Sequence, residues 1–323
     1  MPEIFNRFLQ NFQNYSKKFF NFFGRIFGGF VIFSLAFSIS LTFSLNILSF
    51  PRKNSPKFCL FLSILTIIPL FYFMFFWIKT SFSPVKKSPF FNEFTQKSPF
   101  YSSRGFDSSE LAFSCKKCSR AKFARVHHCS NCNHCVVRFD HHCPWVFTDI
   151  NINNHAYFIY FLGWAFIPSL IYFMISVVIF GVNFNAIFEL GSQGSVRNTV
   201  GFFYCLIMSL ASAVSSGLLF IFHLIITSRN ETTIEYYDNI DYKRNCAAKK
   251  QIYLNPFDTG SKLMNFQAIF GKQNFKNMIL GAFLPWKKIY VDSDNFVYPT
   301  RNFLFDANTG YVLNKPIHPL GGE

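Results

Sequence analysis

Charged residues are scarce in this sequence. Only 15% of its 323 residues are Asp, Glu, Lys or Arg, well below the roughly 25% that is usual in soluble domains. Half of the residues are hydrophobic, and 48 of them are phenylalanine. This composition argues against a soluble protein and directs attention to the long apolar runs.

Four long runs that contain almost no charge decide the fold class. They occupy residues 26–50, 58–82, 156–182 and 199–227, and each exceeds the roughly 20 residues that a helix needs to cross a membrane. Buried helices of a large soluble protein are a weak alternative, because a chain this short could hardly cover four of them. We therefore expect an all-α membrane protein with four transmembrane helices.

Acidic residues are particularly few, with 16 Asp and Glu against 31 Lys and Arg. The basic residues gather in 1–25, 83–155 and 228–323. By the positive-inside rule we expect these parts to face the cytosol, although three basic residues in 51–57 oppose this mildly. The positive charge favours anionic lipid headgroups or an anionic substrate as partners, and not nucleic acid.

Five parts of the chain follow from these patterns. Residues 1–25 combine helically spaced apolar residues with polar ones and predict a cytosolic helix on the membrane surface; a Phe-rich tail without fixed structure is the alternative. Spans 1 and 2 lie in 26–82, a cytosolic region in 83–155, spans 3 and 4 in 156–227, and a cytosolic C-terminal region in 228–323. We expect no cleavable signal peptide, and a location in the endomembrane system (Golgi or ER) or the plasma membrane.

Six of the nine cysteines lie between residues 115 and 143. Thiols on the cytosolic side stay reduced, and clustered cysteines with histidines there indicate metal binding or catalysis. Paired C-x2-C steps let two thiolates reach one tetrahedral zinc ion, and the number of candidates suits two ions. The region therefore predicts a small zinc-binding domain between spans 2 and 3. Its Cys and His candidates are Cys115, Cys118, His128, Cys129, Cys132, Cys135, His141, His142 and Cys143.

The remaining cysteines and histidines have plainer interpretations. We expect Cys59 and Cys205, inside spans, to be small buried apolar residues. Cys246 is interpreted as an ordinary exposed thiol, with lipidation as the alternative. His127 and His134 stand next to candidate ligands and are expected to be surface histidines.

Cys143 is left over if both zinc ions take their ligands from the other residues. Asp140 and His141 precede it closely. An Asp-His pair orients an imidazole as a base, and the base takes the proton of the thiol. A reactive thiolate at a membrane surface suggests acyl transfer through a thioester, while the alternative is that Cys143 is another ligand.

At these residues the sequence resembles the DHHC-type protein S-acyltransferases (protein palmitoyltransferases). The resemblance rests on "HHCSNCNHCVVRFDHHCPWV" and on the spacing of Asn154 and Phe158. It extends to "TTIE" at 232–235, which is similar to the family's T-T-x-E, and to "NPFDTGSKLMNFQAIFG" at 255–271. The family has four spans and a cytosolic cysteine-rich domain between the second and the third.

The resemblance implies a role for each residue of the motif. Cys143 would be the acylated nucleophile, with Asp140 and His141 as its orienting acid and base. The donor would be a long-chain, palmitoyl-type acyl-CoA, and the acceptor a cysteine near the membrane in a cytosolic or membrane-associated protein. One zinc ion would be held by Cys115, Cys118, His128 and Cys135, and the other by Cys129, Cys132, His142 and the residue at position 149.

Position 149 is the main departure from the family, because the usual cysteine is here Asp149. A carboxylate is a competent zinc ligand, and we expect Asp149 to complete the second site. Two smaller departures are "KFAR" at 122–125, with Phe123 where proline is common, and "FSPV" at 82–85, which only partly matches the family's D-P-G element.

Several peripheral features have two interpretations each. Thr232 and Glu235 would also form an ordinary helix capping box, and the NPFDTG segment an ordinary turn. Trp145 is either an interfacial aromatic residue or a roof over the acyl chain. Basic residues are candidates for the CoA phosphates, with solvated charge as the alternative: Lys116, Lys117, Arg120, Lys122, Arg125 and Arg138.

Three rival functions remain open. A catalytically weakened or inactive zinc-dependent membrane scaffold of the same family is the first. A metal transporter would need ionisable residues within the spans, which offer only His223 and the terminal Lys79. A nucleic-acid-binding zinc protein fits the charge but not the four spans.

Overall fold

The computed structural model describes the chain in several segments. The chain divides into two compact units. The first consists of Met1–Ser81, Pro144–Phe147 and Tyr160–Phe220, and the second consists of Phe82–Cys143, Thr148–Ile159 and Ile221–Glu323. The expected surface helix at 1–25 and all but two residues of the first expected span lie outside the described residues. These are 36–37, 56–90, 113–122, 125–182, 193–248, 251–253, 255, 257–284, 304–306 and 312–313.

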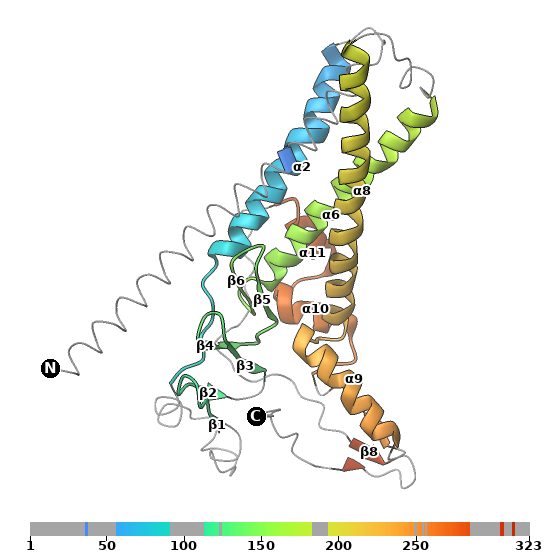
Figure 1. Cartoon of the computed structure of the whole chain (residues 1–323). Helices are drawn as coiled ribbons and strands as arrows, with labels where there is room; N and C mark the ends of the chain where they lie inside the picture. The colour runs from blue at the N-terminus through green and yellow to red at the C-terminus, as the bar shows by residue number, and fades with distance from the viewer. Residues whose placement is uncertain are drawn as a thin grey trace, which may run out of the picture. The chain divides into compact units, whose positions relative to one another are not determined.

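Three long helices account for the other expected spans (Figure 1): α2 (Pro56–Phe82), α6 (His155–Val182) and α8 (Gln193–Ser228). Within the described residues, each contains a stretch long and apolar enough to cross a membrane. The predicted runs 58–82, 156–182 and 199–227 are thus confirmed as helices of spanning length. The fourth predicted span is not among the described residues.

Aromatic rings and small residues pack the three helices in the first unit. Tyr72 of α2 stacks on Trp164 of α6, with 4.5 Å between ring centroids. At Gly217 of α8, an added Cβ would lie 2.7 Å from the ring of Phe166 on α6. A larger residue could not be accommodated there without displacing that ring, and such small residues let membrane helices approach closely.

The cysteine-rich region consists of short hairpins, which corrects the all-α expectation for this part of the chain. In this region a candidate metal-ligating residue or a turn recurs every few positions. That leaves no run of about 12 residues, the length at which an isolated helix becomes even marginally stable. The hairpins are β1 (Phe113–Ser114) with β2 (Ala121–Lys122), β3 (Val126–Cys129) with β4 (His134–Val137), and β5 (His141–Cys143) with β6 (Thr148–Ile150).

The segment that follows α2 runs along the outer edge of β4. Val137 N donates to Lys86 O at 2.9 Å, and Ser88 N donates to Cys135 O at 3.0 Å. Lys87 and Val136 form an antiparallel bridge. This strap occupies the backbone groups of an edge strand that would otherwise be open.

In the C-terminal part of the second unit, the described residues form three helices and a small sheet. Helix α9 begins with the predicted capping box, because Thr232 N donates to Glu235 Oε2 at 2.8 Å and Glu235 N donates to Thr232 Oγ1 at 3.3 Å. The elements are α9 (Thr233–Ala248), α10 (Lys262–Phe270), α11 (Phe275–Gly281), and the antiparallel strands β7 (Gln251–Tyr253), β8 (Leu304–Asp306) and β9 (Val312–Leu313).

Candidate active site and metal centres

Strand alternation in the hairpin β3–β4 sorts its ligands into two groups. His128 lies opposite Cys135, and Cys129 lies opposite His134. Neighbouring residues of a strand point to opposite faces, whereas residues directly opposite each other share a face. One face of the hairpin therefore presents His128 and Cys135, and the other presents Cys129 and His134.

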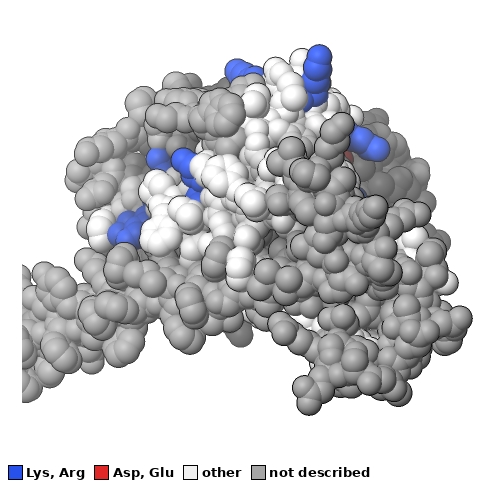
Figure 2. Space-filling view, turned by 90° about the horizontal axis from the view of Figure 1, so that it is seen from above, with Lys and Arg blue, Asp and Glu red and all other residues white. Residues whose placement is uncertain are grey.

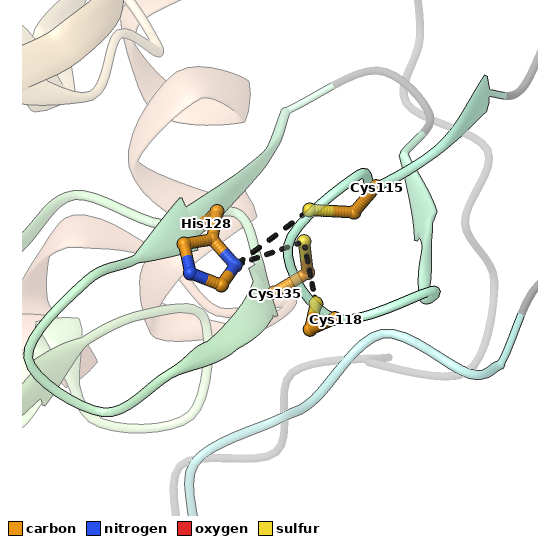
Figure 3. Close-up of side chains that lie close together, drawn as sticks. All are labelled: Cys115, Cys118, His128 and Cys135. Carbon is orange, nitrogen blue, oxygen red and sulfur yellow. Dashed lines mark hydrogen bonds between the residues drawn. The ribbon is translucent and has the colours of Figure 1, made fainter.

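The first cluster brings together the four side chains shown in Figure 3. His128 Nδ1 lies 3.6 Å from Cys115 Sγ and 3.9 Å from Cys135 Sγ, and Cys118 Sγ lies 3.6 Å from Cys135 Sγ. Ligands of one tetrahedral zinc would be about 3.5–3.8 Å apart, given metal–ligand lengths of about 2.0–2.3 Å. The donor set and its spacing therefore fit a zinc ion.

The second cluster contains Cys129, Cys132, His142 and Asp149. All four ligand atoms lie within 4.8 Å of one another. His142 Nδ1 is 3.8 Å from Cys129 Sγ and 3.5 Å from Cys132 Sγ, which again matches tetrahedral ligand spacing. This donor set fits a zinc ion as well.

Asp149 is the member of the second cluster that differs in kind. Its Oδ1 lies 2.7 Å from His142 Nδ1 and accepts a hydrogen bond from Cys129 Sγ at 2.9 Å. The first contact is shorter than the roughly 3.4 Å between two N or O ligands of one zinc. The side chain is fully buried. Position 149 therefore supplies an oxygen donor where the first cluster has only sulfur and nitrogen.

Alternation in the hairpin β5–β6 separates the adjacent histidines of the motif. His142 lies directly opposite Asp149 and shares its face. His141 and Cys143 precede and follow His142, so their side chains point to the other face of the strand. One short strand thus contributes a ligand to the metal cluster on one side and a histidine and a thiol on the other.

Asp140 is held in place by three hydrogen bonds. Its Oδ2 accepts from His141 Nδ1 at 2.7 Å and from Thr233 Oγ1 at 2.7 Å, while Oδ1 accepts from Thr233 N at 2.9 Å. The side chain is completely buried. Burial acts to raise the pKa of Asp140, but its electrostatic interaction with His155 and the hydrogen bond from His141 outweigh burial and hold that pKa well below its ordinary value.

The pKa of His141 moves in the opposite direction. Burial acts to lower it, but the hydrogen bonds to Asp140 and to the Cys143 thiol prevail and raise the pKa of His141 to about 10. Because Nδ1 donates to Asp140, Nε2 is the ring atom left for Cys143, whose side chain is buried. The carboxylate, the imidazole and the thiol thus form one connected group.

Two buried histidines beside this group are functional candidates that the sequence interpretation missed. The guanidinium of Arg138 can only donate, so His155 Nδ1 accepts its hydrogen bond at 3.2 Å. His155 Nε2 must then carry the hydrogen and donate to His223 Nδ1 at 3.1 Å. His223 had one signal in the sequence, since an ionisable residue well inside an apolar span is uncommon.

Asp140, His155 and His223 each direct one potential metal-ligand atom, a carboxylate oxygen or a ring nitrogen, into a small space. These three atoms lie within 4.8 Å of one another. Both nitrogens of His155 are engaged in the hydrogen-bond chain from Arg138 to His223. That leaves no lone pair of His155 for a metal ion. The two histidines are hydrogen-bonded to each other and lie beside the Asp140 carboxylate.

Aromatic rings confine the His141 imidazole. Phe158 packs edge-on against it at 5.5 Å between centroids, and His223 lies 5.9 Å away. Asn154, four residues before Phe158, donates to Asp149 O at 3.0 Å. Asn154 and Phe158, noted as a pair in the sequence, therefore support β6 and the His141 ring respectively.

Arg125 links the first turn of α9 to the start of β3. Its guanidinium makes two bonds of 2.7 Å to the Glu235 carboxylate and one of 2.7 Å to Asn230 O, and it lies 4.3 Å from the centre of the Phe257 ring. Glu235 therefore serves both the capping box and a buried ion pair. Arg125 is buried in these contacts, and Arg138 is buried beside His155 and Asn230, which removes both from the candidate set for CoA phosphates.

The NPFDTG segment packs on the residues that connect α8 to α9. Asn230 Nδ2 donates to Phe257 O at 2.9 Å, and Asn265 Nδ2 donates to Ser228 O at 2.9 Å. Thr259 N donates to Asn265 Oδ1 at 3.0 Å. The segment is therefore more than a turn, because it braces the loop that carries Thr233.

The described surface in Figure 2 shows several Lys and Arg side chains and almost no acidic ones. Lys116 and Lys117 are exposed, while Arg120 lies 4.3 Å above the Phe90 ring and donates to Ser88 O. The two lysines are the freest remaining candidates for an anionic substrate. Trp145 is 64% exposed, which leaves both of its interpretations open.

The structure describes the side chains of four single residues about which an expectation was drawn from the sequence. Cys205 is buried, as expected, whereas Cys246 is also buried and is not the exposed thiol that was expected. His127 and His134 are half-buried and not simple surface histidines. Burial of His134 arises because β4 directs it to the same face as Cys129. The side chain of Cys59 lies outside the described residues.

Comparison with known proteins adds independent findings. The family model for the DHHC palmitoyltransferase matches residues 109–240. "Palmitoyltransferase PFA3" of Yarrowia lipolytica is 33% identical over 174 residues, 49% of this chain and 42% of the relative. "Probable protein S-acyltransferase 13" of Arabidopsis thaliana is 31% identical over 220 residues, 67% of this chain and 65% of the relative.

A human relative, "Palmitoyltransferase ZDHHC15", is 34% identical over 143 residues, 44% of this chain and 40% of the relative. The chain thus spans about half the length of the curated relatives it matches. The matched region 109–240 contains both metal clusters, the Asp140–His141–Cys143 group and Thr233. Through this domain the chain belongs to the DHHC-type protein S-acyltransferase family.

Proposed function

We propose that the protein is a membrane-embedded protein S-acyltransferase of the palmitoyl type. It transfers a long-chain acyl group from acyl-CoA, through an acyl-Cys143 intermediate, to a cysteine of a protein substrate. The observation that carries the proposal is the buried Asp140 carboxylate, which holds His141 Nδ1 at 2.7 Å next to the Cys143 thiol. Family membership supports the same chemistry.

The first step loads the enzyme. His141 takes the proton of Cys143, and Asp140 stabilises the imidazolium that results. The Cys143 sulfur attacks the thioester carbonyl carbon of acyl-CoA and forms a new carbon–sulfur bond. The bond from that carbon to the CoA sulfur breaks, and CoA leaves with the proton held by His141.

The second step unloads the enzyme. The thiol of the substrate cysteine gives its proton to His141 and attacks the carbonyl carbon of acyl-Cys143. The bond to the Cys143 sulfur breaks, and the acyl chain remains on the substrate as a thioester. One thioester is exchanged for another in both steps, so no oxidant or external energy source is needed.

The two clusters would hold structural zinc ions. Cys115, Cys118, His128 and Cys135 would bind one, and Cys129, Cys132, His142 and Asp149 the other. A zinc ion with four protein ligands supplies folding energy to a small domain with little core. In this protein it would fix the hairpins that present His141 and Cys143.

Charge and hydropathy support a topology for the whole chain. Four spans would place both termini and the zinc domain on the cytosolic side of an endomembrane or the plasma membrane. Exposed basic residues such as Lys116 and Lys117 would meet the CoA phosphates or anionic lipid headgroups. Protein substrates would present a cysteine close to the membrane surface.

The decisive experiment is covalent labelling. Purified full-length protein is incubated with a labelled long-chain acyl-CoA, and the adduct is tested with hydroxylamine, which cleaves thioesters. We expect a hydroxylamine-sensitive adduct on wild type and none on Cys143→Ala. The matched control is Cys246→Ala, which removes another buried thiol of the second unit and is expected to label as wild type does.

The same experiment separates the enzyme from a catalytically weakened or inactive scaffold of the same family. A wild-type protein that binds two zinc ions but forms no adduct would support the scaffold. Equal labelling of wild type and Cys143→Ala would overturn the assignment of Cys143 as nucleophile.

A further inference from the structure

His223, near the C-terminal end of α8, lies beside the Asp140–His141–Cys143 group. One of its ring nitrogens is within 4.8 Å of an Asp140 carboxylate oxygen, and its ring centroid is 5.9 Å from that of His141. Phe158 packs against both imidazoles, with centroid distances of 5.1 Å to His223 and 5.5 Å to His141. His223 is only 2% exposed. An ionisable residue in such a place within a membrane helix usually has a function.

A directional chain of hydrogen bonds fixes which nitrogen of His223 carries the hydrogen. It begins at Arg138, whose guanidinium can only donate and does so to His155 Nδ1 at 3.2 Å. Because Nδ1 of His155 accepts, Nε2 carries the ring hydrogen of His155 and donates it to His223 Nδ1 at 3.1 Å. His223 Nδ1 therefore accepts, and the hydrogen of His223 is on Nε2.

This Nε2–H group of His223 is not used within the described part of the protein. No nitrogen, oxygen or sulfur atom there accepts a hydrogen bond from it. It is also not one of the side-chain atoms that lack both a partner and contact with solvent, so a small group can reach it. A donor without an acceptor among aromatic rings is unfavourable, and it would gain most from an acceptor that arrives with a substrate.

Arg138 makes this N–H group a stronger donor. The guanidinium is completely buried, so solvent screens its charge poorly. The hydrogen bonds run in one direction, from Arg138 through His155 to His223, and each bond of such a chain polarises the next. The Nε2–H group of His223 is the positive end of this chain, and it would attract a negative charge that develops beside it.

Acyl transfer through Cys143 would create such a charge. When the sulfur attacks the thioester carbonyl carbon, the electron pair of the C=O bond moves onto the oxygen, and it returns as the CoA sulfur leaves. Enzymes of acyl transfer stabilise this oxyanion with donors that are already oriented. We propose that His223 is a catalytic residue, whose Nε2–H group donates a hydrogen bond to the thioester oxygen in both steps. His223 keeps its proton throughout, and the inference rests on the proposed function.

The test compares two reactions of Cys143 in detergent-solubilised, full-length protein. Acylation by palmitoyl-CoA passes through an oxyanion, whereas alkylation by iodoacetamide displaces iodide from a saturated carbon and does not. Both reactions need the thiolate that His141 supplies. Single-turnover rates at Cys143 are measured by mass spectrometry over a range of reagent concentrations, for wild type, His223→Phe, His223→Gln and His155→Phe.

We expect His223→Phe, which keeps a ring but has no N–H group, to lower the maximal acylation rate by about 10²–10³-fold, the range for loss of one oxyanion donor. The acyl-CoA concentration that gives half of this rate should stay the same, because the bond strengthens only in the transition state. The alkylation rate should be that of wild type. His223→Gln keeps an N–H donor and should recover part of the acylation rate.

His155→Phe provides a second test that leaves His223 in place. It removes the donor that fixes the hydrogen on Nε2, so acylation should slow by less than in His223→Phe, and alkylation should not slow. If acylation and alkylation slow equally in these variants, His223 acts only through His141 or the fold, and the inference is overturned. An unchanged acylation rate in His223→Phe overturns it as well. A wild-type protein that is alkylated but never acylated at Cys143 would instead refute the proposed function, and this inference with it.

Discussion

The two metal clusters share a construction but differ in their fourth ligand and in what they support. Each begins with a C-x2-C turn that ends in a left-handed residue, Ser119 (φ 54°) in the first and Asn133 (φ 56°) in the second. Three sulfurs and a nitrogen complete the first cluster, whereas the second contains two sulfurs, a nitrogen and the Asp149 carboxylate.

The second cluster also shares a strand with the Asp-His-Cys group. Its candidate ligand His142 lies between His141 and Cys143 on β5, so whatever fixes this strand fixes those two residues as well. The first cluster shares no strand with Cys143. Under the proposed function, activity should therefore depend more directly on the second cluster, the one with the oxygen-containing ligand set.

Removal of zinc should produce the largest effect. We expect a chelator titration to release the two ions in separate steps, the second cluster first, because a carboxylate holds zinc through a harder donor than a thiolate does. Cys143 labelling should be lost with the first ion released. The measurement combines zinc content with acyl-CoA labelling at each chelator concentration. If labelling persists until both ions are gone, the labelling of Cys143 does not depend more on the second cluster than on the first.

The next prediction separates the two faces of β5. Asp140→Asn should reduce the rate of Cys143 acylation by about 10²–10⁴-fold, the range for loss of an effective general base. Zinc content should stay at two per chain, because Asp140 contacts the catalytic face and not the cluster. Single-turnover labelling and metal analysis give both values. A loss of zinc in this variant would mean that the two faces are not independent.

Glu235→Gln should destabilise both clusters without preference. Glutamine can keep the capping box at α9 but removes the negative charge opposite the buried Arg125 guanidinium, and breaking a buried ion pair costs about 3–5 kcal/mol. Arg125 precedes β3, the strand that serves both clusters. Unfolding in denaturant should report the loss. A selective loss of one zinc would contradict the prediction.

The last prediction concerns the pH dependence of stability. Folding raises the pKa of His141 from about 6.5 to about 10. A raised pKa stabilises the fold fully below about pH 6.5, and this contribution declines as the pH rises and is lost near pH 10. The difference in melting temperature between wild type and His141→Gln should therefore shrink from pH 6.5 to pH 10. A constant difference would show that the Asp140 pair does not control this titration.

Local spacing made much of the molecule predictable. Apolar runs of more than 20 residues predicted the helices α2, α6 and α8 to within a few residues at most of their ends, because length and hydropathy suffice for a span. Ligand sets followed from C-x2-C spacing and the family resemblance. Burial of Cys246 was not predicted, because it depends on tertiary packing. The hairpins of the cysteine-rich region were also missed, although the short spacing of its candidate ligands leaves no run long enough for a stable helix.

The sequence by itself determined three helices of spanning length, the set of Cys and His candidates, the Asp-His-Cys order and the carboxylate at position 149, since each is a matter of composition or short spacing. The division of the candidates into two ligand groups came from the family resemblance, and the tertiary structure decided which side chains share a face. Strand register places His142 with the second metal cluster and His141 on the opposite face with Cys143. Contacts between segments far apart in the sequence join Arg125 to Glu235 and link Arg138, His155 and His223. Such pairs become neighbours only when the chain folds, because no periodicity connects them along the sequence.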